Sequence, residues 1–251
     1  MRLKSLVLSA LLICSVTISA SAEVTVAVAA NLQYTFDELK SEFQKETGVE
    51  LKGVIGSSGK FTTQIENGAP FDVFLSADMD YPKTLAKEGL ALNTPKIYAY
   101  GTLAIWTMTG VDFSNGIEAL ANPSVKKIAI ASPKTAPYGH QAVNALKHYG
   151  IYVQAEKKLV YGESIAQTNQ FITTKAADLG ITAKSVVMAP QMKGQGKWID
   201  VPQEAYEPIA QGVVILKHAE SGHMDEARKF FEFLFSEKAA EIFKKYGYVL
   251  P

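Results

Sequence analysis

The stretch Val24–Ala29 (VTVAVA) runs directly into Ala30-Asn31-Leu32 and then into a helical pattern, and this junction decides the fold. The first six residues are almost all small or β-branched, as expected for a strand buried on both faces. Gly48 follows the helical pattern and ends it. The apolar residues of that pattern are spaced four, three and four apart, which places them on one helix face: Leu32, Phe36, Leu39 and Phe43.

The same alternation of a short apolar run and a helical pattern recurs along the chain. Further strands are expected at residues 49–55, 72–76, 103–107, 127–131, 159–161, 179–182 and 213–216. Helices are expected at about 59–67 and 138–148, from 164, and as two segments between 224 and 246 broken near Ser236. Strands that alternate with helices predict an α/β fold with mainly parallel sheets flanked by helices.

The first 22 residues predict a signal peptide. Two basic residues, Arg2 and Lys4, precede an apolar run from Leu6 to Ile18, and Ala20-Ser21-Ala22 forms a small-x-small cleavage site before Glu23. The apolar run is too short to cross a bilayer as a helix, which needs roughly 20 residues. We therefore expect a periplasmic mature chain that starts at about Glu23, with an uncleaved N-terminal anchor as the alternative.

Composition narrows the classes of function. Without residues 1–22 the 25 basic residues lose Arg2 and Lys4, so 23 remain against 25 acidic ones, a net charge of −2. This balance lacks the basic excess of a nucleic-acid surface, so we expect no nucleic-acid partner. Cys14, the only cysteine, is removed as well. The mature chain therefore offers no disulfide, thiol nucleophile or thiolate metal site.

Four strand-to-helix junctions are candidates for a binding site, because ligands of such sheets bind beyond the carboxyl ends of the strands. Each consists of small or capping residues just before a helical pattern: Ala29-Ala30-Asn31-Leu32, Gly56-Ser57-Ser58-Gly59, Ala136-Pro137-Tyr138-Gly139 and Gly162-Glu163-Ser164-Ile165. Free N–H groups at a helix start carry about half a positive charge and bind anions. Asn31, Ser58 and Ser164 are also good N-caps, so capping alone is the alternative at any one junction. Two junctions in each half suit a cleft between two closing lobes.

The residues in these junctions indicate what kind of anion they would bind. Apart from Lys60, which we interpret as an exposed helix residue, they contain no lysine or arginine. A site that neutralised a phosphate-like group through ion pairs would carry bidentate arginine. Backbone N–H groups and hydroxyls suit a fully ionised tetrahedral oxyanion instead. His140, close to the third junction, is interpreted as a surface residue.

No catalytic group stands out elsewhere. The four histidines lack metal-ligand spacing. We interpret His218 and His223 as solvated loop residues, and Asp72 and Asp78 as turn caps. The chain has no Gly-x-Ser-x-Gly elbow, P-loop or nucleotide fingerprint. We therefore expect a binding protein without a cofactor rather than an enzyme.

Four separate stretches carry a resemblance to a known family: VAVAANL at 26–32, GSSG at 56–59, QIENGAPFDVFLSAD at 64–78 and AAEIFKKYGY at 239–248. Together with the export signal, they resemble the periplasmic molybdate-binding proteins of ABC transporters, over essentially the whole mature chain. The resemblance implies a two-lobed, type II periplasmic binding protein fold with the ligand cleft between the lobes. It also implies capture of molybdate or tungstate and delivery to a membrane permease, by a monomeric protein.

The resemblance implies a set of residues that hold the oxyanion, with no direct ligand to the metal: Ala30, Asn31, Ser58, Tyr138 and Ile165. Within this set, Asn31 and Ser58 fall on family positions that contact the anion. Tyr138 and Ile165 fall on positions that mainly offer backbone N–H groups. Some members carry a ligand tyrosine where this chain has Ala183, a role that Tyr138 would take here.

The resemblance also implies the domain boundaries, with residues 23–102 plus 213–251 as lobe 1 and residues 103–212 as lobe 2. Three alternatives stay open for the function. The first is a receptor for sulfate or another small oxyanion. The others are an enzyme on the same fold, such as porphobilinogen deaminase, and the effector domain of a transcription regulator. The enzyme should show a cofactor-bearing cysteine and the regulator a helix-turn-helix without an export signal, whereas this chain shows the reverse.

Overall fold

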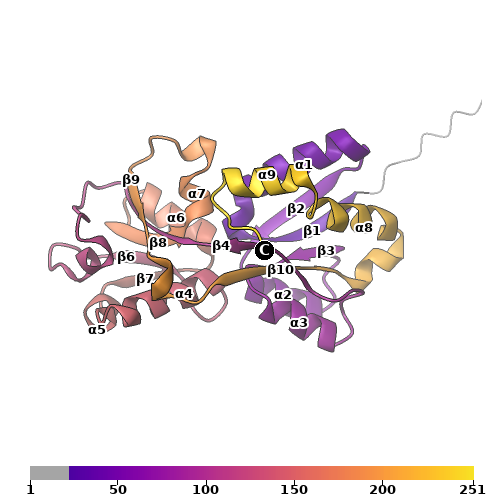
Figure 1. The fold of residues 1–251 in the computed structure, drawn as a ribbon. Helices are drawn as coiled ribbons and strands as arrows, with labels where there is room; N and C mark the ends of the chain where they lie inside the picture. Colours follow the sequence, from indigo (N-terminus) through magenta and orange to yellow (C-terminus); the bar gives the residue numbers. More distant parts are fainter. Residues whose placement is uncertain (1–22) are drawn as a thin grey trace, which may run out of the picture.

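The computed structural model describes residues 23–251, so the predicted signal peptide lies outside the described residues. The chain forms two five-stranded sheets, each flanked by helices, which lie side by side (Figure 1). Among residues 23–251, no helix has both the length and the apolar character needed to cross a membrane.

The first sheet, in lobe 1, has the strand order β2-β1-β3-β10-β4. Its strands are β1 (Val24–Ala29), β2 (Leu51–Gly56), β3 (Val73–Leu75), β4 (Lys96–Gly101) and β10 (Ile209–Ile215). β1 pairs in parallel with β2 and β3, and β10 is antiparallel to β3 and β4. The helices of this lobe are α1 (Gln33–Thr47), α2 (Ser58–Glu66), α3 (Asp80–Lys87), α8 (Met224–Phe233) and α9 (Glu237–Lys245). Short 3-10 turns precede α1 and α8, namely η1 (Ala30–Leu32) and η5 (Lys217–Ser221).

The second sheet, in lobe 2, has the order β7-β6-β8-β5-β9. Its strands are β5 (Leu103–Thr107), β6 (Ile128–Ala131), β7 (Leu159–Gly162), β8 (Leu179–Ala183) and β9 (Lys197–Asp200). β6 is parallel to β7 and β8, and β5 is antiparallel to β8 and β9. The helices are α4 (Pro137–His148), α5 (Tyr152–Glu156), α6 (Ile165–Thr173) and α7 (Lys184–Val187). The 3-10 turns are η2 (Gly116–Ala121), η3 (Pro190–Met192) and η4 (Gln203–Ala205).

The predicted two-lobed α/β fold is confirmed, and the structure refines the sheets from mainly parallel to mixed. The antiparallel pairs arise where the chain passes between lobes. Only Thr102 separates β4 from β5, so the chain runs from one sheet into the other without a helical crossover. The strand expected at residues 213–216 already begins at Ile209. The return to lobe 1 therefore lies before Ile209 rather than at residue 212.

The apolar face predicted for the first helix is the packing face of α1. Its four residues are between 0% and 2% exposed, and full burial of such a side chain contributes about 1.5–3 kcal/mol. The Phe43 ring meets Phe230 of α8 edge-on, with ring centroids 5.2 Å apart. Gly48, at φ 73°, closes α1 in the left-handed conformation that a glycine adopts readily. This packing holds the start of α1 against the end of β1, at the first predicted junction.

Candidate functional site

A small pocket between the lobes gathers residues from all four predicted junctions. Its walls consist of Ala29, Ala30, Asn31, Gly56, Ser57, Ser58, Ala77, Ala136, Pro137, Tyr138 and Ile165. The five predicted site residues are all among them, and each is at most 3% exposed. The cavity itself measures about 10 Å³, far below the roughly 300–1,000 Å³ of sites for drug-sized ligands. The pocket therefore suits a ligand of only a few atoms.

Four helix starts meet at this pocket. α2 begins at Ser58, α4 at Pro137 and α6 at Ile165, while η1 begins at Ala30 and leads into α1. The first N–H groups of a helix have no partner within it and form its positive end. Since Pro137 has no N–H group, Tyr138 supplies the first one of α4. The arrangement presents several N–H donors from two lobes to one small space.

The Ser58 hydroxyl is oriented by Ala77, which follows strand β3. Its Oγ accepts the backbone N–H of Ala77 at 2.9 Å, which leaves the hydroxyl proton free for another acceptor. The prediction that Ser58 caps a helix is wrong, because Ser57 occupies the N-cap position of α2. The Ser57 side chain makes no capping bond, and its buried Oγ has no partner among residues 23–251. Sequence reasoning missed Ser57 as a site residue, although it stands beside Ser58 in the same junction.

Asn31 anchors a buried polar network rather than capping a helix, so its N-cap prediction is also wrong. Its Nδ2 donates to Gln211 Oε1 at 2.7 Å and to the Tyr248 hydroxyl at 3.0 Å. Gln211 Nε2 donates in turn to the Tyr138 hydroxyl at 2.9 Å, which joins lobe 1 to lobe 2. Burial raises the pKa of Tyr138 well above its usual value, so its hydroxyl stays protonated. The network holds both site residues in place.

Sequence reasoning did not single out Gln211 or Tyr248. Gln211 lies within strand β10 and is fully buried, where its two carbonyl lone pairs serve Asn31 and the Tyr98 hydroxyl. A glutamine inside an otherwise apolar strand was the available signal, because buried amides require hydrogen-bond partners. Ser164, by contrast, caps α6 as predicted, with its Oγ accepting the N–H of Gln167.

In the described part of the chain, no charged side chain lines the pocket. Lys60 pairs with Glu163 at 2.5 Å, and both side chains are about half exposed, which agrees with its interpretation as an exposed helix residue. His140 is exposed and lies outside the pocket, also as predicted. Ala183 is buried at the start of α7 and does not line it either. A bound anion would therefore be balanced by helix ends and hydroxyls.

The two lobes contact each other around this pocket. The Gly59 N–H donates to the Thr135 carbonyl at 2.9 Å, and the Ser185 hydroxyl donates to the Asn31 carbonyl at 2.8 Å. Both bonds cross from one lobe to the other, as does the Lys60–Glu163 ion pair. The described conformation is therefore a closed one, in which the pocket walls come from both lobes.

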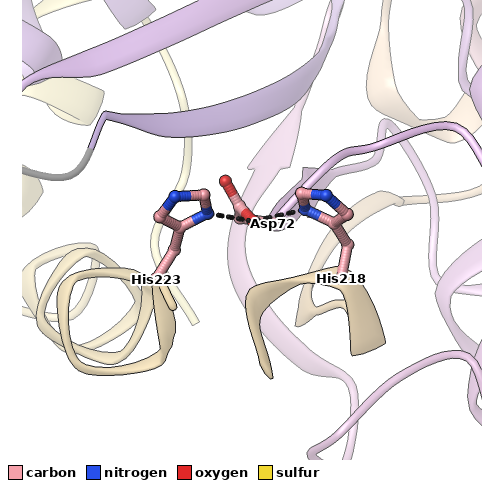
Figure 2. Close-up of side chains that lie close together, drawn as sticks. All are labelled: Asp72, His218 and His223. Atoms are coloured by element: carbon pink, nitrogen blue, oxygen red, sulfur yellow. Dashed lines mark hydrogen bonds and ion pairs between the residues drawn. The ribbon is translucent and has the colours of Figure 1, made fainter. Parts of the chain in front are cut away.

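Two predictions made for acidic residues have opposite outcomes. Asp78 does act as a cap, because its Oδ1 accepts the N–H of Tyr81 in the first turn of α3. Burial raises the pKa of Asp78 to about 6. Asp72 is not a turn cap. It is fully buried, and its Oδ1 lies 2.8 Å from Nδ1 of His218 and 3.1 Å from Nδ1 of His223 (Figure 2). The interpretation of these histidines as solvated loop residues is therefore only partly right, because their side chains are 35% and 28% exposed but both contact the buried carboxylate.

Two α/β lobes that close over a small, uncharged pocket define a two-lobed solute-binding protein. Residues 24–249 match the family described as bacterial extracellular solute-binding protein. The molybdate-binding protein of Azotobacter vinelandii is 40% identical over 231 residues, which cover 92% of this chain and 91% of that protein. The chain therefore belongs to the bacterial extracellular solute-binding proteins and, within them, to the molybdate-binding protein family.

Solved structures show the same fold. The periplasmic molybdate-binding protein of Azotobacter vinelandii matches with a TM-score of 0.85 and 35% identity, over 91% of this chain and 99% of that one. The sulfate-binding protein SubI from Mycobacterium tuberculosis H37Rv matches with a TM-score of 0.74, over 90% of this chain and 86% of that one. At 14% identity, the second likeness shows the fold alone.

Proposed function

We propose that this protein captures molybdate in the periplasm and delivers it to the permease of an ABC transporter. The observation that carries the proposal is the uncharged pocket into which four helix starts and the Ser58 hydroxyl project donors. A fully ionised tetrahedral oxyanion offers acceptors only, which matches a wall of donors. The relatives described above, which bind molybdate, support the same ligand.

The proposed site residues divide by the group they contribute. Ser58 donates its hydroxyl proton, since its lone pair already accepts from Ala77. Ala30, Tyr138 and Ile165 contribute the N–H groups of their helix starts. Asn31 contributes its N–H group, while its side-chain amide holds the network behind the pocket. Ser57 joins this set, because its buried hydroxyl has no other partner in the described chain.

Selectivity would come from the size of the closed pocket. Sulfate has the charge and shape of molybdate but shorter bonds, so donors placed for the larger anion would lie beyond good hydrogen-bond distance from sulfate oxygens. Tungstate is close to molybdate in size, and we expect it to bind as well. A receptor for sulfate or another small oxyanion is the second candidate, because the uncharged wall by itself accepts any tetrahedral dianion.

The same pocket supports a binding role without chemistry. Among residues 23–251, its lining includes no carboxylate, imidazole, thiol or amine that could act as a general acid, a general base or a nucleophile. We therefore propose a receptor rather than an enzyme, and we expect it to be monomeric and to need no cofactor. Its closed state would be the form presented to the permease.

A thermal-shift panel on the chain from Glu23 tests the ligand. Molybdate, tungstate, sulfate, phosphate and chromate are compared, because a ligand that binds only the native state stabilises it by about 2.7 kcal/mol at 100 times its Kd. Molybdate and tungstate should raise the melting temperature well above the other anions. A larger shift with sulfate would favour the second candidate, and no shift with either molybdate or tungstate would refute the proposal.

A further inference from the structure

We propose that Asp72, His218 and His223 form a binding site for a divalent transition-metal ion of the Zn²⁺ type, separate from the oxyanion pocket. Figure 2 shows the two imidazole rings facing the same carboxylate from either side. One ligand atom from each residue, a ring nitrogen or a carboxylate oxygen, lies within 4.8 Å of the others. Two imidazoles and one carboxylate are a donor set that suits zinc.

The distances are close to those that a metal ion requires. Zinc–ligand bonds of about 2.0–2.1 Å in a tetrahedron place neighbouring ligand atoms about 3.3 Å apart. The Asp72 Oδ1 lies 2.8 Å from Nδ1 of His218 and 3.1 Å from Nδ1 of His223. Shifts of a few tenths of an ångström would therefore bring the carboxylate and each histidine to coordination spacing. The ligand atoms of the two histidines lie within 4.8 Å of each other, so the part-exposed rings would have to approach by up to about 1.5 Å to reach the same spacing. A water molecule would complete the tetrahedron.

The carboxylate is oriented by the surrounding backbone. Its second oxygen, Oδ2, accepts the N–H of Thr25 in β1 at 2.7 Å, which leaves Oδ1 to face the histidines. The Asp72 backbone is held on both sides, since its N–H donates to the Thr25 carbonyl and its carbonyl accepts from Leu216. Hydrogen bonds that orient a ligand in this way are a general property of metal sites.

The two histidines are held near one another by a local turn, and they connect the site to solvent. His218 lies in η5 and His223 immediately precedes α8, with the N–H of His223 donating to the Ala219 carbonyl. Their side chains are 35% and 28% exposed, whereas Asp72 is fully buried. An ion can therefore enter from the histidine side and meet the buried negative charge.

This site lies away from the oxyanion pocket. Asp72 precedes β3, and the pocket residue Ala77 follows it. Five residues at about 3.3 Å each separate the two by roughly 16 Å. The metal would tie the segment after β10 to Asp72, the residue before β3, within lobe 1. We expect it to stabilise that lobe without contacting the anion.

Isothermal titration calorimetry with Zn²⁺ tests the site on the untagged chain from Glu23 after removal of metals with EDTA. One ion should bind per chain and raise the melting temperature. Mg²⁺ should do neither, because it prefers oxygen ligands. His218→Gln and His223→Gln should each weaken Zn²⁺ binding at least about tenfold, since even outer-shell partners contribute about 10–100-fold to metal affinity.

His148→Gln provides the matched control, because this exposed histidine lies on α4 in the other lobe. It should leave Zn²⁺ binding unchanged, and a cooperative unfolding transition shows that each variant is folded. No Zn²⁺ binding by the unmodified chain would overturn the proposal. Equal binding by the His218/His223 double variant would also overturn it, because the ion would then sit elsewhere on the surface. Molybdate binding is measured separately, so failure of one proposal is distinguishable from failure of the other.

Discussion

Replacement of Ser58 by alanine tests the proposed anion site most directly. Ser58 is 1% exposed and lines the pocket, and its hydroxyl accepts the N–H of Ala77 at 2.9 Å. Ser58→Ala removes a pocket hydroxyl whose oxygen accepts a backbone N–H and whose proton is free to donate to the anion. It also leaves the buried Ala77 N–H without an acceptor. The substitution should therefore weaken molybdate binding and lower the stability of the ligand-free protein.

The two effects have separable magnitudes. A hydrogen bond to a charged partner contributes about 1.5–3 kcal/mol, and each 1.4 kcal/mol is a factor of ten in affinity. Ser58→Ala should thus raise the Kd for molybdate about 10- to 150-fold. Binding is not abolished, because the donors of four helix starts remain. The unpaired Ala77 N–H should lower the free energy of unfolding by about 1–3 kcal/mol.

Calorimetric titration with molybdate measures the first effect, and urea unfolding without ligand measures the second. Ser236→Ala is the matched control, because the Ser236 hydroxyl caps α9 through the N–H of Ala239 and does not line the pocket. It should cost about 1 kcal/mol of stability and leave affinity unchanged. An unchanged Kd for Ser58→Ala would remove this serine from the site. An equal loss of affinity in both variants would show that the change reports stability alone.

Three further outcomes follow from the described contacts. The pKa of Asp78 is about 6 in the folded protein, above its usual 3.8, so the unfolded chain releases the proton at lower pH. The contribution of Asp78 to stability should therefore fall by up to about 3 kcal/mol as pH rises from about 4 to 6. Urea unfolding measured across this pH range should show the decrease, and Asp78→Asn should lack it. Glu163→Gln breaks an exposed ion pair with Lys60, so calorimetry should show a loss of molybdate affinity below about 1 kcal/mol. A hundredfold loss of affinity would mean that the ion pair takes part in binding the anion. Gly101→Ala would place a methyl group against the Tyr138 hydroxyl and should lower the free energy of unfolding by about 1–3 kcal/mol, measured by urea unfolding. A loss under about 0.5 kcal/mol would show that the hydrogen-bond network around Tyr138 can shift to accommodate the methyl group.

Local sequence signals were sufficient for the elements that position the site. The run at 24–29 and the apolar spacing after it predicted β1 and α1, because burial on both faces of a strand and on one face of a helix leaves a periodic pattern. The four junctions were predicted as well, since small and capping residues before a helix are a local feature. All of the pocket-lining residues except Ala77 belong to these junctions, and the resemblance to molybdate-binding proteins singled out five of them.

The tertiary structure decided how side chains distant in the sequence pair. Asn31 meets Gln211 and Tyr248 only because β10 and the C-terminal segment return to lobe 1. For the same reason, Asp72 meets His218 and His223 about 150 residues later. A sequence pattern describes one element at a time, so Asn31 and Asp72 were interpreted as caps and the two histidines as solvated residues. Their hydrogen-bond partners depend on how the elements pack together, and the sequence around each residue does not indicate that packing.

The strand-to-helix junction that begins at Val24 shows both contributions. By itself, the sequence determined that this segment is a buried strand leading into an amphipathic helix, because hydrophobic periodicity and turn residues act within a few positions of the chain. It also showed that, apart from Lys60 and Glu163, the junctions before the pocket helices carry no charged side chain. Only the tertiary structure brought four such starts from two lobes around one small space. Convergence of that kind depends on sheet order and on the two crossings between lobes, which are properties of the whole folded chain.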